Sequence, residues 1–225
     1  MMKALNHFIL ENKILKIQNL SVNYNGIKAV KNLSLSLSKN EVIAVLGITG
    51  SGKSSLINAI MGLVPIHTGS IYLYHEDITY MSIYERVYRG ISLIPEKKHV
   101  FPTLTTEENL RIGGHKLPTQ IFKSSITNVY DKFPILNQRR KIKAENLSGG
   151  EQKLLAIGIA LMMKPKILLL DEPLTGLSPK IATEMINIIK KLKEDGLSMI
   201  ITEQTFSISK ILDKKYVLEN GETKS

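Results

Sequence analysis

The sequence predicts an α/β fold with a largely parallel β-sheet. Three continuously apolar runs are typical of strands that are buried on both faces, namely EVIAVLG (41–47), KILLLDEP (166–173) and LSMIIT (197–202). Stretches with the apolar spacing of helices lie between these runs. Strands that alternate with helices favour a parallel sheet covered by helices.

Strands of a different pattern are expected near the N-terminus. The segment LKIQNLSV (15–22) reads as a strand, and LSLSLS (33–38) alternates strictly between leucine and serine. Strict alternation predicts one buried and one exposed face. We therefore expect an antiparallel β region here. A last strand that runs into a turn is expected at KYVLENGE (215–222).

Two helices of the core have recognisable ends. One is expected from Lys53 to Gly62. The other begins with Ser178 as N-cap and Pro179 at the first helical position, where its missing N–H costs nothing, and Gly196 closes it.

The segment from about residue 81 to 163 has a different character. It contains a capping-box pattern at Thr105 and Glu108, and a long helix is expected from Ser148 to Met163. We interpret it as a helical lobe inserted into a core of about 1–80 and 164–225. Core and lobe together would form a single domain over residues 1–225.

The composition excludes several classes of protein. The 225 residues include no cysteine, so no disulfide framework is expected, and no apolar run is long enough for a membrane span. The first residues, MMKALNHFILENK, lack the pattern of a signal peptide. The formal charge of +10 would suit nucleic acid, an anionic membrane or a phosphate ligand. The lysines are spread along the chain, however, and we predict no nucleic acid partner.

The strongest functional signal is GITGSGKS, residues 47–54, which matches G-x-x-x-x-G-K-[ST] between a buried strand and a helix. Its glycines let backbone N–H groups converge on a phosphate at the helix N-terminus. Lys53 would add charge to the β- and γ-phosphates, and the Ser54 hydroxyl would bind Mg²⁺. The residues expected to contact a nucleotide triphosphate are Gly47, Ile48, Thr49, Gly50, Ser51, Gly52, Lys53, Ser54 and Ser55.

Two acids stand at the end of the buried strand KILLLDEP, where open α/β sheets bind ligands. Asp171 is the candidate holder of Mg²⁺, through water. Glu172 is the candidate general base for an attacking water, and with Lys53 it forms the expected catalytic pair.

The motif LSGGEQK (147–153) indicates a second anion-binding helix start. Ser148 and Glu151 form a capping-box pattern, which alone would serve only the helix. A helix cap does not require the two glycines, and their N–H groups, at positions 149 and 150, would be open to an anion. One nucleotide does not need both helix starts from a single chain. We therefore expect Ser148, Gly149, Gly150 and Glu151 to complete the site of a second subunit in a dimer.

These motifs, in this order, resemble those of the nucleotide-binding subunit of ABC transporters over about residues 15–222. The stretches SLIPEKKHVFPTLTTEENL, LSGGEQKLLAIGIALM, LLLDEPLTGLSP, ITEQ and YVLENGE are most similar to the branched-chain amino acid type and its amide or urea relatives. The resemblance implies an ATPase that uses ATP and Mg²⁺ and drives a separate transmembrane permease. It also implies a peripheral place on the cytoplasmic face of the membrane, as a homodimer or with a second ABC ATPase.

The resemblance assigns three further residues. Tyr24 matches the aromatic residue that stacks on adenine. Glu96 stands where the family has a glutamine that contacts Mg²⁺ and the attacking water, and the loop from Glu96 to Leu104 would receive a helix of the permease.

Glu203 falls where most of the family has a histidine that contacts the γ-phosphate. An ionised carboxylate cannot donate a hydrogen bond to phosphate. Glu203 would therefore point away and order the loop, or be protonated, or leave hydrolysis to Glu172; we favour the last.

Two other functions stay open at this point. One is a soluble ABC ATPase that acts on ribosomes or DNA without transport. The other is a weakly hydrolysing regulatory module, which Glu96 and Glu203 motivate. This chain does not encode the transported substrate or the direction of transport, which other subunits set. The resemblance alone favours import of branched-chain amino acids or a related small amide.

Overall fold

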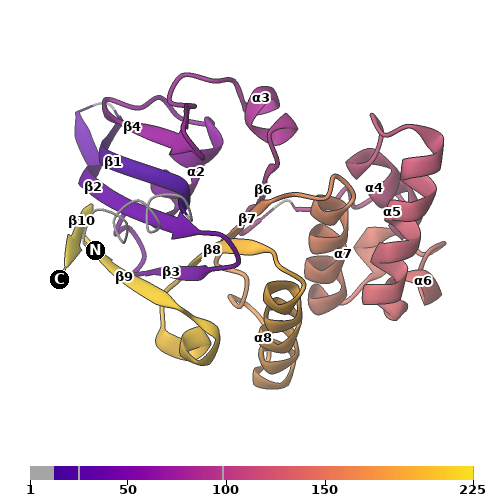
Figure 1. Cartoon of the computed structure of the whole chain (residues 1–225). Coiled ribbons are helices and arrows are strands. Elements are labelled where there is room, and N and C mark those ends of the chain that lie inside the picture. Colours follow the sequence, from indigo (N-terminus) through magenta and orange to yellow (C-terminus); the bar gives the residue numbers. More distant parts are fainter. Residues whose placement is uncertain (1–12, 25, 98, 225) are drawn as a thin grey trace, which may run out of the picture.

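The computed structural model describes residues 13–24, 26–97 and 99–224, and two β-sheets organise it (Figure 1). The interpretation of the first 12 residues as lacking a signal peptide lies outside the described part of the chain. The smaller sheet has four antiparallel strands in the order β2-β1-β4-β5. Its strands are β1 (Lys13–Tyr24), β2 (Ile27–Ser38), β4 (Thr68–Leu73) and β5 (Glu76–Asp77). In β2, Leu33, Leu35 and Leu37 are all buried, which confirms the pattern expected for 33–38.

The larger sheet has six strands in the order β10-β9-β3-β8-β7-β6. The strands from β9 to β6 are parallel, and β10 is antiparallel to β9. They are β3 (Val42–Leu46), β6 (Ile91–Ile94), β7 (Ile167–Asp171), β8 (Ser198–Glu203), β9 (Lys214–Glu219) and β10 (Glu222–Lys224). Every residue of β3, β7 and β8 is buried, which confirms the prediction from their apolar runs.

Within the described ranges, four helical elements accompany the core. They are α2 (Lys53–Met61), α3 (Ile83–Tyr88), α8 (Pro179–Glu194) and the 3₁₀ helix η2 (Phe206–Ile211). As expected, α2 ends at Gly62 in the left-handed conformation, and Ser178 is the N-cap residue of α8, although its side chain makes no capping hydrogen bond.

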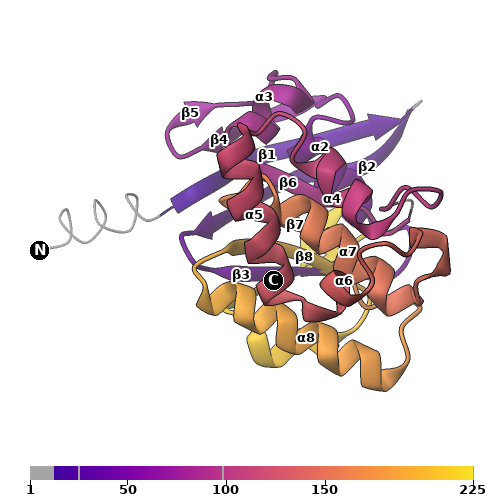
Figure 2. The ribbon, with the colours of Figure 1, turned by 90° about the vertical axis from the view of Figure 1, so that its right-hand side faces the viewer.

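The helices of the lobe gather on one side of the molecule, away from the four-stranded sheet (Figures 1 and 2). They are α4 (Thr106–Gly113), α5 (Thr119–Lys132), α6 (Pro134–Gln138), the 3₁₀ helix η1 (Ala144–Asn146) and α7 (Gly149–Leu161). The expected capping box of Thr105 and Glu108 is present at the start of α4.

The expected start of the lobe at residue 81 is too early. Residues 91–94 form β6, which pairs with β7 at the edge of the parallel sheet, where Ile91 lies opposite Ile167. This apolar run, ISLI, has only four residues. A run so short does not distinguish a strand from a piece of helix.

The strand β3 separates two hydrophobic clusters. Val42, Ala44 and Leu46 belong to the cluster that includes α7 and α8, whereas Ile43 and Val45 belong to the cluster with α2 and the four-stranded sheet. Because the strands are parallel, the carboxyl ends of β3, β7 and β8 meet at one edge. The phosphate loop after β3, the acids at the end of β7 and Glu203 at the end of β8 therefore lie at that edge, whereas the LSGGEQK motif does not follow any of these strands.

Candidate active site

The loop between β3 and α2 is fixed by close backbone contacts at two of its glycines. A Cβ atom on Gly47 would lie 2.3 Å from the carbonyl oxygen of Leu218 in β9. Gly52 has a φ of +105°, and a Cβ there would lie 2.2 Å from the carbonyl oxygen of Ala29 in β2. Only glycine fits either position, so the two sheets together hold the loop in place.

The N-terminus of α2 keeps its N–H groups free of side chains. Its N-cap, Gly52, provides no side-chain hydrogen bond, and no acidic residue stands in the first turn. The first N–H groups of a helix have no partner within the helix, and they carry the positive end of its dipole. This helix start is therefore available to an anion.

A cavity of about 310 Å³ lies at this helix start. It brings together most of the expected phosphate loop with Glu96 and Glu172. Its lining residues are Ala29, Thr49, Gly50, Gly52, Lys53, Ser54, Ser55, Glu96, Lys97, Glu172 and Gln204.

Other expected residues lie near this cavity but do not line it. Gly47 and Ile48 act through their carbonyl groups, which accept hydrogen bonds from Lys53. Ser51 is buried, and its hydroxyl oxygen has no hydrogen-bond partner among the described residues. Tyr24, at the end of β1, is 38% exposed and also lies outside the lining, so its stacking on adenine stays a prediction.

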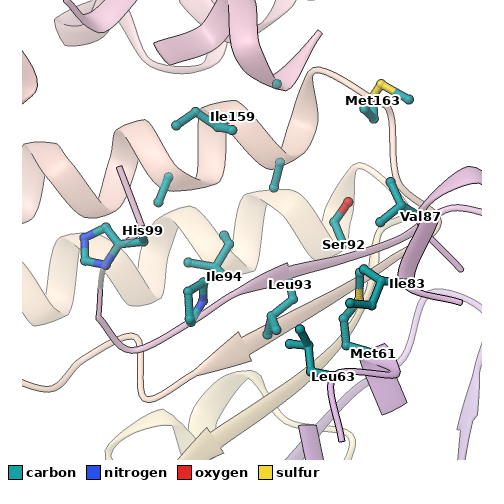
Figure 3. Close-up of a pocket in the computed structure, with 14 residues that line it drawn as sticks. Met61, Leu63, Ile83, Val87, Ser92, Leu93, Ile94, His99, Ile159 and Met163 are labelled. Carbon is teal, nitrogen blue, oxygen red and sulfur yellow. The ribbon is translucent and has the colours of Figure 1, made fainter. Parts of the chain in front are cut away.

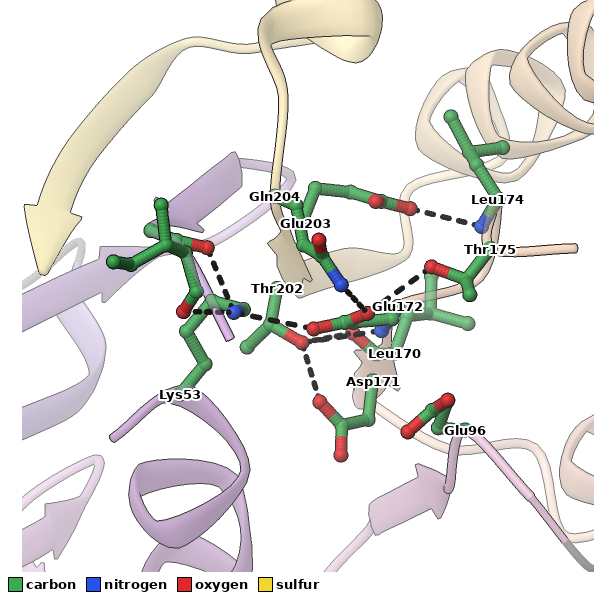
Figure 4. Close-up of polar contacts among 12 residues, drawn as sticks. Lys53, Glu96, Leu170, Asp171, Glu172, Leu174, Thr175, Thr202, Glu203 and Gln204 are labelled. Atoms are coloured by element: carbon green, nitrogen blue, oxygen red, sulfur yellow. Dashed lines mark hydrogen bonds and ion pairs between the residues drawn. The ribbon is translucent and has the colours of Figure 1, made fainter. Parts of the chain in front are cut away.

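Lys53 is buried and is held by three oxygen atoms (Figure 4). Its Nζ donates to the carbonyl oxygens of Gly47 at 2.8 Å and Ile48 at 3.0 Å, and it lies 3.1 Å from Oε1 of Glu172. The Glu172 carboxylate thus stands where an anionic ligand of Lys53 would stand. A bound triphosphate must replace or share this ion pair.

Glu172 is held in place by its backbone and by its side chain. Its φ of +47° lies in the left-handed region, which costs about 1–3 kcal/mol for a residue other than glycine. Its Oε2 accepts hydrogen bonds from Gln204 Nε2 at 2.7 Å and Thr175 Oγ1 at 3.0 Å. Burial raises the pKa of Glu172, but the hydrogen bonds from Gln204, Lys53 and Thr175 outweigh it and lower the pKa overall. The carboxylate is therefore ionised at neutral pH, as a general base must be.

Ser54 and Asp171 are the residues expected to hold a metal ion with Glu96, and of these two only Ser54 lines the cavity. Asp171 is almost fully buried, and its Oδ1 accepts a hydrogen bond of 2.6 Å from Thr202 Oγ1. No group of three or more His, Cys, Asp or Glu side chains suited to a metal occurs among the described residues. Mg²⁺ takes one or two protein ligands and completes its shell with water and phosphate oxygens, so the Ser54 hydroxyl and the Asp171 carboxylate are of the kind that could hold it.

Glu203 is buried but faces away from the cavity. Its Oε1 accepts a hydrogen bond of 2.8 Å from the backbone N–H of Leu174, and burial raises its pKa. This geometry corresponds to the alternative in which Glu203 orders the loop. The neighbouring Gln204, which the sequence analysis did not single out, faces the cavity and Glu172 instead. Its only signal was its place directly after the end of β8.

The start of α7 lies apart from this cavity. The expected capping box of Ser148 and Glu151 is present. A Cβ atom on Gly149 would meet nothing within 4 Å, so nothing within the described chain requires glycine there. Ser148, Gly150 and Glu151 line a different cavity of about 210 Å³, which shares no lining residue with the first. One chain therefore does not bring together the two helix starts that are predicted to bind anions.

A helix start that is open to anions, begins with a buried lysine and faces a carboxylate across one cavity defines the class of P-loop nucleotide triphosphatases. Residues 30–175 match the family model described as ABC transporter. The chain belongs to the ABC transporter family, and it is an ATP-binding and ATP-hydrolysing subunit of that family.

Individual relatives support this assignment. The high-affinity branched-chain amino acid transport ATP-binding protein BraG of Pseudomonas aeruginosa is 37% identical, over 92% of this chain and 90% of its own length. The probable branched-chain amino acid transport ATP-binding protein LivF of Archaeoglobus fulgidus is 36% identical, over 92% and 89%. A crystal structure of a nucleotide-free ATP-binding cassette from an ABC transporter superposes with a TM-score of 0.87 at 30% identity, covering 95% of this chain and 90% of that one. Among the described residues, no helix is both long and apolar enough to cross a bilayer.

Proposed function

We propose that this chain is a single nucleotide-binding domain that powers a separate transmembrane permease from the cytoplasmic face of the membrane. The observation that carries the proposal is the separation of the two anion-binding helix starts, at α2 and α7, into two cavities without a common residue. A dimer related by two-fold symmetry brings the α7 start of each subunit to the α2 cavity of the other. The partner is a second copy of this chain or a second ATPase of the same kind.

Hydrolysis is assigned to the residues that meet at the α2 cavity. Loop residues 47–52 and the start of α2 hold the phosphates, and Lys53 neutralises their charge. Glu172 accepts the proton of the attacking water, and Gln204 and Thr175 fix the direction of its carboxylate. Ser148, Gly149, Gly150 and Glu151 of the second subunit close the site over the phosphates.

Mg²⁺ is proposed to bind beside the phosphates. Ser54 would supply a hydroxyl ligand, Asp171 would act through water, and Glu96 reaches the same cavity from the loop after β6. When bound, the ion neutralises charge on the β- and γ-phosphates. Tyr24 stays our candidate for stacking on adenine.

The contact with the permease is assigned to an apolar cavity of about 300 Å³ between the core and the lobe (Figure 3). Met61 and Ile83 line it from α2 and α3, Ile94 from β6, and Ile159 from α7. A helix of the permease that inserts here touches core and lobe at once. Movement of the lobe would then be transmitted to the permease.

The relatives named above include proteins of branched-chain amino acid transport. We propose import of branched-chain amino acids, or of a related small amide, as the function that this subunit drives.

A pair of matched substitutions tests the contact with the permease. Ile83 is 40% exposed in the apolar cavity, and Ile121 is 44% exposed on α5 outside it. Each lies in the first turn of its helix, where an acid is tolerated. Ile83→Asp should release the chain from membranes of the native host while ATP binding persists, and Ile121→Asp should leave it bound. Release by both variants, or by neither, would rule out this docking site.

A further inference from the structure

The turn that follows β7, residues 172–175, carries Glu172 in a left-handed conformation that only its surroundings can maintain. A hydrogen bond of 3.2 Å from Thr175 N to the carbonyl oxygen of Glu172 closes the turn. Its ends are also tied to the rest of the chain, because the N–H of Glu172 donates to Thr202 and the carbonyl oxygen of Leu174 accepts from the N–H of Leu177. The carbonyl oxygens of Pro173 and Thr175 and the N–H of Leu174 are bound from outside by two charged side chains, Lys153 and Glu203.

Lys153 reaches this turn from α7. Its Nζ donates to the carbonyl oxygens of Thr175 at 2.7 Å, Pro173 at 2.8 Å and Glu172 at 3.4 Å. Lys153 forms no ion pair within 4.0 Å among the described residues, so its contacts to the turn are all with uncharged carbonyl groups. An ammonium group has three donors, and the turn takes all of them.

Glu203 reaches the same turn from the end of β8. Its Oε1 accepts from the N–H of Leu174, as Figure 4 shows, and its side chain is buried. Lys153 thus binds carbonyl groups on either side of Leu174, and Glu203 binds the N–H of Leu174 between them. The two side chains come from the lobe and from the core, respectively.

We propose that Lys153 and Glu203 are positioning residues that hold the turn 172–175 so that the Glu172 carboxylate faces Lys53 and the cavity. The inference rests on the proposed role of Glu172 as general base. Because Lys153 belongs to α7, it also links the lobe directly to the turn that carries Glu172. Lys153 lies on the same helix as Gly149 and Gly150, about 6 Å further along the axis than Gly149. A shift of α7 therefore moves the carbonyl contacts of the turn.

The positioning role of Lys153 can be tested by the pH dependence of kcat, because several ionisable groups face its ammonium group. They are Glu203 at the end of β8, Glu96 and His99 after β6, and Glu172 after β7. Burial lowers the pKa of Lys153, although the carboxylates oppose this effect. Arginine stays protonated where lysine does not. In Lys153→Arg, the alkaline limb of the kcat profile should therefore move to higher pH.

The test compares variants of the full chain with ATP and Mg²⁺ as probes. Lys153→Met should lower kcat about 10- to 100-fold while the Kd for ATP changes less than about twofold, because misplacing a base costs rate and not binding. Lys153→Arg should restore most of kcat. Glu203→Gln keeps an oxygen acceptor for Leu174 and should keep kcat, whereas Glu203→Leu should lose it.

Lys193→Met is the matched control, since Lys193 also binds a carbonyl group, that of Ile211, and lies on α8. It should leave kcat unchanged. Wild-type kcat in folded Lys153→Met and Glu203→Leu, or an equal loss in Lys193→Met, would overturn the inference. Glu172→Gln, measured beside them, separates the two claims. If it hydrolyses ATP normally, the role of Glu172 fails; if it is inactive while Lys153→Met and Glu203→Leu are normal, only the positioning role fails.

Discussion

The two helix starts that we propose to bind anions differ in the residues that surround their N–H groups. The start of α2 has a left-handed glycine as N-cap and no acid in its first turn, and Glu172 approaches Lys53 from another strand. The start of α7 has a serine N-cap and carries Glu151 in its own first turn. At the α2 start no side chain caps the N–H groups, and the Glu172 carboxylate is the anion that pairs with Lys53 in the absence of a ligand. The α7 start is largely satisfied by its own side chains.

This difference predicts unequal tasks for the two helix starts. The capping box of α7 satisfies the N–H groups of Ser148 and Glu151, and no hydrogen bond of Gly149 N or Gly150 N occurs within the described part of the chain. We propose that the α7 start adds contacts to phosphates that are already bound, since no lysine is among the described residues that line its cavity. We expect chemistry to depend on the α2 site, and closure of the dimer to depend on the α7 start.

The largest effect should follow from removing the proposed base at the α2 site. Glu172→Gln keeps the shape of the side chain but loses the proton acceptor, so kcat should fall about 10²- to 10⁴-fold. ATP binding should persist, and the ATP-bound variant should accumulate as a dimer. Phosphate release and size-exclusion chromatography with ATP measure both. Glu76→Gln, a surface substitution at a residue that does not line the cavity, is the control. Turnover near the wild-type rate would remove Glu172 as base.

A charge placed at Gly149 tests the α7 start in the dimer. Nothing lies within 4 Å of a Cβ there, and an acid in the first turn favours the helix by about 0.3–1 kcal/mol. Gly149→Asp should therefore fold at least as stably as the wild type. It should nevertheless lower turnover on the order of 100-fold, because its carboxylate would stand beside the phosphates of the second subunit.

Gly149→Asn is the uncharged control for this substitution, and it should lose much less activity than Gly149→Asp. Thermal unfolding and phosphate release at several salt concentrations separate stability from charge repulsion. Equal activity of the two variants would mean that no phosphate approaches Gly149.

A smaller effect should come from the serine caps, of which the chain offers a matched pair. Ser148 on α7 and Ser82 on α3 form the same capping box, with Glu151 and Glu85. Replacing either serine by alanine should cost about 0.5–2 kcal/mol of stability, measured by urea unfolding. Only Ser148→Ala should also lower turnover beyond that loss. Equal turnover in the two variants would reduce Ser148 to a helix cap.

The α2 site could be predicted from the sequence because each part of it lies within one short, continuous motif. The phosphate loop needs its glycines and Lys53 in a fixed order, and Glu172 follows a recognisable apolar strand. The roles of Glu203 and Gln204 were not predictable in the same way. Neighbouring residues at the end of a strand point to opposite sides, and the sequence does not say which side faces the ligand. The contacts of Lys153 with the turn 172–175 join segments about 20 residues apart, and no motif records them.

The smallest effect concerns the acid that already occupies the α7 start. Hydrogen bonding from the backbone N–H of Ser148 is the main reason why the pKa of Glu151 lies below 4.5. Its contribution to stability is therefore present above that value and is lost as the pH falls through the lowered pKa. Glu151→Gln still accepts the capping hydrogen bond, so it should cost only about 0.3–1 kcal/mol at neutral pH, the part due to charge at the helix start. Urea unfolding between neutral pH and about pH 3 should show the two proteins converging at the acid end. A constant difference across that range would mean that shape, and not charge, is what Glu151 gives to α7.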